Sequence, residues 1–440
     1  MDRRRFMKWL GLYSSGFLLG GCNSQKSPPS HDDPPVDYRN TVFVAKNGTP
    51  AQNIDKVIEM RFGGIDRFIG ADDVVVINPN GQWSNQGASN CECCMALIDS
   101  ILARPGGFDG EIVFCENTQF QLEGYWTAGA GGKIRNGPYN WNEMIQSYHD
   151  RGQTNVSGVR LWRNIDQPDD WPVIAGPASG QGWVRPEWRS PTTGCLFYLP
   201  YPIIRSPYSD RLIDLKNGVF DGTFDGQPPL KFIKMPNLNN HGNNANQDYA
   251  GITSAVKSFL GITELEGDYR GPFNDGHRHM HTYSDACHGG NKAFAAGEAV
   301  GAWMNHCRAP DVVITTAEWV GWGSRTGEDA TRARTVGLAD DPATLDYYMS
   351  KYVLWPLCTS QQYFNPDYDV SSNKTRQTIE GCVGMGYGTA DESDIKKYVF
   401  DFDNPTVFGF DIDREFGEYF RGRSTMDEIL ELIEKFENRS

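Results

Sequence analysis

Residues 41–80 read TVFVAKNGTPAQNIDKVIEMRFGGIDRFIGADDVVVINPN, and this stretch decides the class of fold. The apolar runs at 41–45 and 73–77 predict two β-strands, the second with both faces covered. Between them, apolar side chains recur at helical spacing: Ile54, Val57, Ile58 and Phe62. The glycine pair at 63–64 ends that helix. The order strand, helix, strand is typical of an α/β fold with a parallel sheet.

The chain beyond residue 80 continues this alternation. Apolar periodicity predicts further helices at 93–103, 141–151, 252–260, 295–304 and 342–352, and further strands at 111–115, 230–234 and 311–315. We therefore expect an α/β fold: a largely parallel, mixed sheet with helices on both faces. Sites in such sheets form at the carboxyl ends of the strands, so we expect Asn78 and Asn80 to bind a cofactor or ligand. Residues 116–117 occupy a similar strand end.

The segment 119–229 is irregular and rich in aromatic residues, Gly and Pro. We interpret it as an elaboration over the sheet, either a lid or binding wall or a surface excursion held by aromatic packing. At the other end, 403–440 is a C-terminal extension whose residues 426–437 predict an amphipathic helix. The whole of 41–440 is expected to form a single domain.

The N-terminus predicts export. Residues 3–8 read RRRFMK and match the twin-arginine pattern, and the apolar run at 9–19 is too short to span a membrane permanently. Residues 19–22, LGGC, resemble a lipobox, which predicts cleavage before Cys22 and acylation of its thiol. Residues 23–40 then form a flexible tether. The alternative is an ordinary secretory signal with a chance cysteine.

We therefore expect an exported protein on the periplasmic or outer face of a bacterial cell, attached to the membrane only through its lipid. Its net charge of −15 argues against a nucleic-acid partner, because phosphate binding needs clustered Lys and Arg. The chain contains no G-x-G-x-x-G, P-loop or G-x-S-x-G motif, which argues against nucleotide-dependent and serine-hydrolase classes. A small-molecule ligand remains the expected partner.

Five blocks, in this order, are similar to those of the domain-of-unknown-function family numbered 362: residues 42–80, 235–261, 309–319, 338–352 and 385–400. The resemblance covers most of 41–401 and implies an α/β fold with functional positions at His241 and Lys257. The chain departs from the family pattern at Asn78 and Asn239, where the family usually has lysine. The departures imply a less anionic ligand or another source of positive charge.

The run HRHMH at 277–281 is the first candidate for chemistry. In a strand, alternate residues share a face, so His277, His279 and His281 would present three imidazoles to one ion, with His288 close by in sequence. Zinc, copper, nickel and iron accept such ligands. The alternative is a set of loop histidines bonded to the backbone.

A cysteine cluster is the second candidate. Cys91, Cys93 and Cys94 stand at an expected helix start, where the helix dipole lowers a thiol pKa, and Cys115 ends the next strand. Together they predict a site for a transition metal or an iron–sulfur cluster. Disulfides are the alternative, because the expected compartment permits them.

The third candidate unites His241 with Lys257, which the predicted helix at 252–260 would bring near one helix start. That pairing suits proton transfer or the binding of a carboxylate or phosphate. Glu318 is expected at a strand end as an acid or ligand. The sequence thus favours an enzyme with a metal or redox centre that acts on a small polar substrate. The alternative is a non-catalytic lipoprotein that binds a metal ion or small solute.

Overall fold

The structure is a computed structural model that describes residues 38–81, 83, 85–117, 126–127, 137–161, 182–241, 250–264, 275–280, 291–325, 327 and 329–404. Apart from Tyr38, these residues belong to one compact unit that begins at Arg39. The predicted signal, with Cys22, and the amphipathic helix at 426–437 lie outside the described residues. Among the helices described, none has the length and apolar character needed to cross a membrane.

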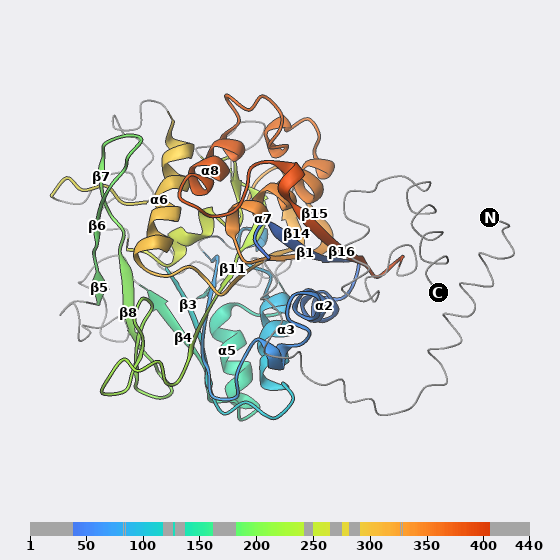
Figure 1. Cartoon of the computed structure of the whole chain (residues 1–440). Coiled ribbons are helices and arrows are strands. Elements are labelled where there is room, and N and C mark those ends of the chain that lie inside the picture. The colour runs from blue at the N-terminus through green and yellow to red at the C-terminus, as the bar shows by residue number, and fades with distance from the viewer. Residues whose placement is uncertain are drawn as a thin grey trace, which may run out of the picture. The chain divides into compact units, whose positions relative to one another are not determined.

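A ten-stranded sheet forms the centre of the unit (Figure 1). Its main path runs β16 (Lys396–Asp401), β1 (Thr41–Lys46), β15 (Ala330–Ala339), β14 (Val312–Gly321), β11 (Leu230–Met235), β2 (Val74–Pro79), β3 (Glu111–Asn117) and β4 (Val156–Leu161). The five strands from β14 to β4 are parallel, whereas β15 is antiparallel to both of its neighbours. Two short strands, β12 (Asn237–Asn240) and β13 (Ile252–Thr253), extend the sheet beyond the end of β11.

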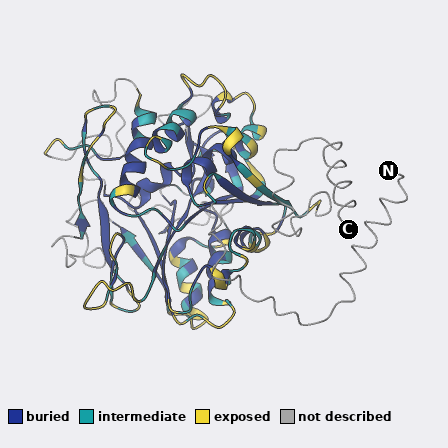
Figure 2. Ribbon diagram, viewed as in Figure 1, coloured by how far each residue is buried: buried dark blue, intermediate teal, exposed yellow. Residues whose placement is uncertain are grey.

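Helices cover both faces of this sheet, which confirms the predicted α/β class. One face carries α2 (Pro50–Phe62), α3 (Cys91–Leu102) and α5 (Trp141–Asp150), and the other carries α6 (Lys292–His306), α7 (Pro342–Met349) and α8 (Lys374–Val383) (Figure 1). Figure 2 shows the consequence, because the central strands are buried along their length. Every residue of β2 is buried, as its unbroken apolar sequence predicts.

The starts of α2 and α3 follow from capping residues. Thr49 and Gln52 form a capping box at the start of α2, with Pro50 at the first helical position, so the helix begins four residues before its first predicted apolar position, Ile54. The side chain of Asn90 accepts the N–H of Cys93 at 3.0 Å and caps α3. As a result α3 begins at Cys91, and three cysteines fall in its first turn.

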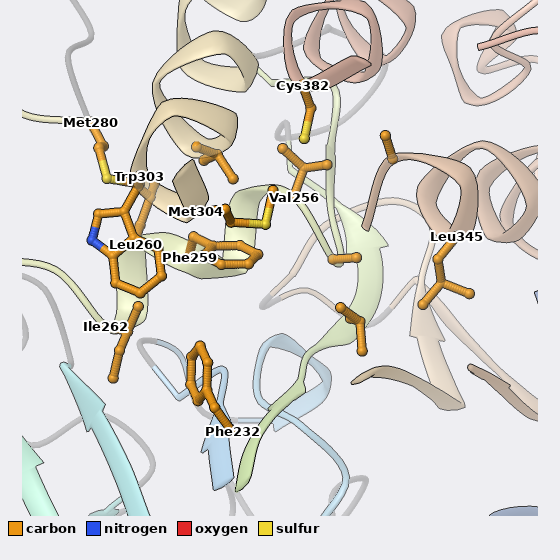
Figure 3. Close-up of a cluster of buried hydrophobic side chains, with 14 of the residues drawn as sticks. Phe232, Val256, Phe259, Leu260, Ile262, Met280, Trp303, Met304, Leu345 and Cys382 are labelled. Atoms are coloured by element: carbon orange, nitrogen blue, oxygen red, sulfur yellow. The ribbon is translucent and has the colours of Figure 1, made fainter. Parts of the chain in front are cut away.

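The core above the sheet is organised around Trp303 of α6 (Figure 3). Its ring lies 5.5 Å from that of Phe259, in the five-residue 3₁₀ helix η4 (Lys257–Gly261), and 6.3 Å from that of Phe232 in β11. Aromatic contacts of this kind stabilise a core beyond the area that they bury. Through Phe259 and Phe232, the core fixes η4 over the carboxyl half of β11.

The α-helix predicted at 252–260 is wrong. Ile252 and Thr253 form β13 and pair with β12, and a carboxylate accepts two of the backbone N–H groups that follow. Asp346 of α7 accepts the N–H of Ala255 at 2.7 Å and that of Val256 at 2.9 Å. These tertiary bonds satisfy backbone groups that an α-helix would have used, and only η4 remains helical.

The interpretation of 119–229 as an elaboration is only half right. Its first part supplies α5 and β4, and β4 is an edge strand of the central sheet paired in parallel with β3. The later part forms a four-stranded sheet of β5 (Trp183–Val184), β8 (Tyr201–Arg205), β9 (Leu212–Asp214) and β10 (Gly218–Phe220), and a hairpin of β6 (Glu187–Arg189) and β7 (Leu196–Tyr198). Figure 1 shows these small strands beside α6.

Short helical turns complete the unit. They are η1 (Ile65–Arg67), η2 (Asn85–Gly87), the π-helical η6 (Ser350–Leu354), η7 (Trp355–Leu357), η8 (Gln362–Phe364) and η9 (Glu392–Asp394). The helix predicted at 342–352 is therefore α-helical only to Met349 and then widens into η6. The sequence also gave no signal for β15 or α8, and both are well formed.

Candidate active site at the carboxyl edge of the sheet

Lys234 and Asn78 meet where β11 and β2 approach their carboxyl ends. The two residues are paired in register, and the side chain of Lys234 is completely buried. Its Nζ donates to Oδ1 of Asn78 and, at 2.9 Å, to the carbonyl of Ser258 in η4. The same Nζ lies 4.8 Å from the centre of the Phe259 ring. A lysine is thus enclosed between two strands and η4.

Burial controls the charge of Lys234. Removal from water lowers its pKa to about 7, because the ammonium form loses its hydration, while the nearby charges of Glu116 and Cys115 act in the opposite direction. Lysine in water titrates near pH 10.4. At neutral pH, the neutral amine is therefore a major form of this side chain.

Glu116 lies one strand further along, on β3, and is also buried. Its Oε1 accepts the N–H of Gly81 at 3.2 Å, and its Oε2 has no hydrogen-bond partner in the described structure. Burial raises the pKa of Glu116 well above its usual range, against the opposing effects of the Gly81 N–H, of Lys234 and of the nearby Trp126 side chain. Close contact with η4 is also evident, because a Cβ added at Gly261 would lie 3.3 Å from Oε1.

Aromatic rings pack near Glu116: Trp126 acts on its carboxyl group, and Trp141 packs against Gly81, whose N–H that carboxyl group accepts. Trp126 and Trp141 pack edge to face with their ring centres 5.5 Å apart, and both contact Phe114 of β3 in the same manner. Gly81 leaves no room for a side chain against the ring of Trp141. This packing excludes water from the carboxyl group, and that exclusion is the physical cause of its raised pKa.

The two asparagines expected to bind a ligand are engaged within the protein. Asn78 accepts from Lys234 and donates to the carbonyl of Cys115 at 2.6 Å, and its position belongs to β2 rather than to a turn. Asn80 donates to the carbonyl of Gly87 at 2.6 Å and shapes the loop before α3. Asn78 orients Lys234, and Asn80 is a loop-forming residue.

The lowered thiol pKa predicted at the start of α3 is wrong. Cys91, Cys93 and Cys94 are fully buried, and none of the three forms a disulfide. Burial raises the pKa of Cys93 and Cys94 well above the usual range, and the charge of Glu318 adds to the effect on Cys93. Desolvation outweighs the helix dipole at Cys93 and Cys94, so these two thiols are protonated at neutral pH.

Cys115 is not part of that thiol cluster. It belongs to the core on the α6 side of the sheet, whereas α3 covers the other face (Figure 1). Cys115 is likewise a free thiol, so the disulfide alternative is wrong for all four cysteines, although Cys195 is disulfide-bonded. Within the described ranges, no three His, Cys, Asp or Glu side chains gather as metal ligands.

The histidine run is only partly described. His277 stacks on Tyr198 at 3.9 Å, and its Nδ1 lies 2.9 Å from Oδ1 of Asp275. His279 is completely buried. The other two expected ligands, His281 and His288, lie outside the described residues, so the multi-histidine metal site stays a prediction.

His241 and Lys257 do not share an α-helix start. His241 follows β12, is buried, and donates its backbone N–H to the carbonyl of Gly251 at 3.1 Å. Lys257 opens η4 and lines a cavity of about 10 Å³ beside Leu260 and Met280. Their joint role stays a prediction.

Glu318 lies inside β14 rather than at its end. Its Oε1 accepts from Nε of Arg332 at 2.6 Å, and Oε2, also buried, has no hydrogen-bond partner among the residues described. Because the charge of Glu318 acts on Cys93, Glu318 lies near the start of α3. An acid or ligand role for Glu318 stays a prediction.

Sequence reasoning missed Lys234 as a functional residue, although a signal existed. Lys234 alternates with Phe232 in a strand of otherwise buried side chains, so its side chain had to enter the core. Glu116 was placed at a strand end without a role. Their connection through η4 depends on tertiary bonds and has no sequence signal.

Comparison with known proteins leaves the family open. No model of a known protein family matches the chain, and no curated protein matches it significantly. The resemblance to family 362 therefore remains a prediction, as do the implied roles of His241 and Lys257.

Proposed function

We propose that this protein is an exported, membrane-anchored α/β enzyme that transfers protons on a small polar substrate at the carboxyl edge of its sheet. One observation supports the proposal above all: Lys234 and Glu116 are both buried beside η4, and no ion pair joins these two described residues. Buried groups with shifted pKa values are concentrated at functional sites, and α/β sheets bind ligands at this edge.

The chemistry follows from the two charge states. A lysine with a pKa of about 7 is a proton acceptor at neutral pH, because its amine is about half neutral there. Glu116, whose pKa is raised by burial, retains its proton to higher pH and can donate it. Asn78 and Ser258 fix the position of the amine. The pair thus supplies a base and an acid on two strands that flank β2.

A non-catalytic lipoprotein that binds a small solute is the second candidate, and one observation favours it. Nζ of Lys234 already donates to two acceptors and faces an aromatic ring, which also suits a fixed positive charge. Under this alternative, the protein would bind a solute and release it unchanged. Turnover of the substrate separates the two candidates.

A transition-metal or iron–sulfur centre would be an additional component. The prediction of such a centre depends on the spacing of His277, His279, His281 and His288 and on the thiols near Cys91. The proton transfer proposed here does not require a metal. Export and lipid anchoring rest on residues 3–8 and 19–22. The disulfide at Cys195 supports export, because disulfides persist mainly outside the cytoplasm.

The test is solvent proton exchange catalysed by the mature, membrane-extracted protein. Proton NMR in deuterated water would follow a panel of small oxo acids, hydroxy acids, amino acids and short sugars. We expect loss of a C–H signal, or conversion, for at least one compound. Lys234→Met and Glu116→Gln should each slow the reaction roughly 100-fold or more, the usual effect of removing a general acid or base.

Lys231→Met is the matched control, because Lys231 lies on the same strand with its Nζ 5.6 Å from the Phe68 ring and outside the site. It should react like the unmodified protein. Binding of a panel compound without exchange or conversion would favour the solute-binding alternative. Full activity of folded Lys234→Met would contradict the assigned role of Lys234.

A further inference from the structure

A cavity of about 400 Å³ lies at the amino ends of β2 and β3, whereas Lys234 lies near the carboxyl end of β11. Its wall includes Val74, the first residue of β2, and Glu111, the first residue of β3. Tyr208, between β8 and β9, and Asp221, after β10, also line it. Pockets of this volume are typical of sites for small molecules. The proton transfer proposed above does not involve this end of the sheet.

Hydrogen bonds fix the loop that closes one side of this cavity. The buried carboxyl group of Glu111 accepts hydrogen bonds from the hydroxyl groups of Ser206 and, at 2.6 Å, of Ser209. Oγ of Ser206 in turn accepts the N–H of Tyr208 at 3.1 Å. Tyr208 is therefore tied to the start of β3, and it lines the cavity while 50% of its surface stays exposed. Because these bonds are already formed, a ligand would bind with little loss of chain entropy.

The lining of the cavity carries an excess of negative charge. Asp72 and Asp109 precede β2 and β3, and the N–H of Asp109 donates to the carbonyl of Ala71 at 2.7 Å, which joins the two loops. Neither carboxylate has a hydrogen bond or ion pair in the described part of the chain. By contrast, Asp221 pairs with Arg211 at 3.4 Å. Like charges held together without a partner repel each other, and a bound cation would relieve that repulsion.

The arrangement of these groups favours an extended organic cation over a metal ion. In the described ranges, no three His, Cys, Asp or Glu side chains gather around one point as metal ligands. A chain with several ammonium groups can instead meet separate carboxylates, while its methylene groups pack on Val74 and Pro228. The exposed ring of Tyr208 suits an ammonium group, because the face of an aromatic ring attracts cations.

We propose that this cavity binds a linear aliphatic polyamine of about the size of spermidine. Asp72 and Asp109 bind ammonium groups, and Tyr208 covers the chain between or beside them. The buried Glu111 positions Tyr208 through Ser206. This site goes beyond the proposed function, because it lies at the other end of β2 and uses none of the residues assigned to proton transfer.

Isothermal titration calorimetry of the mature, membrane-extracted protein with spermidine tests the proposal. We expect saturable binding to one site per chain, and weaker binding at higher salt, because salt screens exposed charges. Asp72→Asn and Asp109→Asn should each weaken binding about threefold to fivefold, and the double variant at least about tenfold. Tyr208→Ala should weaken it about threefold. Asp72→Glu keeps the charge and should retain most of the binding.

Asp210→Asn is the matched control for the overall acidity of the chain. Asp210 lies in the same loop as Tyr208 and loses the same charge, but its side chain pairs with Arg205 at 3.1 Å and does not line the cavity. It should bind spermidine like the unmodified protein. Asp72 and Asp109 are exposed, so their variants should fold, and thermal unfolding of the ligand-free proteins would verify this.

Three outcomes would overturn the polyamine site. The first is no saturable binding of spermidine at low salt. The second is equal weakening by Asp72→Asn and Asp210→Asn, which would mean that spermidine binds only through the net charge of the chain. The third is stoichiometric binding of Mg²⁺, or of uncharged glucose, that displaces spermidine and is lost in Asp72→Asn, because the cavity would then be a site for a metal ion or a sugar.

Discussion

Lys234 and Glu116 depart from the charge states that exposed side chains hold at neutral pH. Burial acts on both in the same physical way, since the charged form of each loses its hydration. The pKa of the lysine falls to about 7 and that of the glutamate rises, so their titrations approach each other. Proton exchange between two groups is efficient when their pKa values are close to the working pH.

The lowered pKa of Lys234 predicts a pH dependence of stability. Between about pH 7 and 10.5 the unfolded chain binds a proton at this lysine and the folded chain does not, so the free energy of unfolding rises with pH. The gain from this residue is on the order of a few kcal/mol. Urea unfolding of the unmodified protein and of Lys234→Met across this range would measure it.

The variant should lose the part of the slope due to Lys234, whereas Lys231→Met should keep the slope of the unmodified protein. Absolute stability is a poorer readout, because Lys234→Met also leaves the acceptors of Asn78 and Ser258 without a donor. Identical pH slopes in all three proteins would show that Lys234 stays charged in the fold.

At the level of elements, α6 and α8 approach each other through glycines. A Cβ at Gly297 would collide with the carbonyl of Thr378, and one at Gly381 with the carbonyl of Phe294. Neither position needs a left-handed backbone, so close helix contact is the reason for glycine at both. The pair holds α8 against α6, whose Trp303 supports η4.

Gly381→Ala should therefore lower the free energy of unfolding by about 1–3 kcal/mol, the usual cost of overpacking a close contact. The control is Gly384→Ala, where the added Cβ would lie 3.4 Å from its nearest neighbour, the carbonyl of Glu380. That change should be close to neutral. Guanidinium unfolding followed by circular dichroism would compare the two. Equal stability of both variants would mean that the helices separate without cost.

Elements with strong periodicity could be predicted from the sequence, and those shaped by tertiary bonds could not. The valine run of β2 and the apolar stripe of α2 led to the correct class of fold. The α-helix expected at 252–260 failed because Asp346, far away in the chain, binds two of its backbone N–H groups. Similarly, β15 was missed because its first half is polar and only its second half is buried.

At the candidate site, too, the sequence predicted some features correctly, and those that depend on tertiary packing could not be predicted. Position at a strand end correctly drew attention to Asn78 and to residues 116–117, but sequence could not tell that Asn78 orients a lysine. The cysteines were recognised as a cluster, yet their pKa direction was wrong because desolvation depends on the packed structure. The positions of residues in the sequence indicate which side chains are candidates for a site, whereas their burial in the folded protein determines their charge.

At the scale of the whole molecule, the thiols and the disulfide place different demands on the compartment. Seven described cysteines form no disulfide, and the fold protects the six buried ones from oxidation. Cys195 is disulfide-bonded and requires an oxidising environment. A protein exported to an oxidising compartment after folding would satisfy both conditions.

Export can be tested through Cys195. Changing Arg3 and Arg4 together to Lys should keep the chain in the cytoplasm, where thiols remain reduced, and Cys195 should then be alkylated without prior reduction. In the unmodified chain, differential alkylation and mass spectrometry should find Cys195 protected and located in the membrane fraction. Arg5→Lys, at the variable position of the pattern, is the matched control and should behave like the unmodified chain. A reduced Cys195 in membrane-fraction protein would contradict the disulfide, whereas an oxidised one in the Arg3 and Arg4 variant would contradict twin-arginine export.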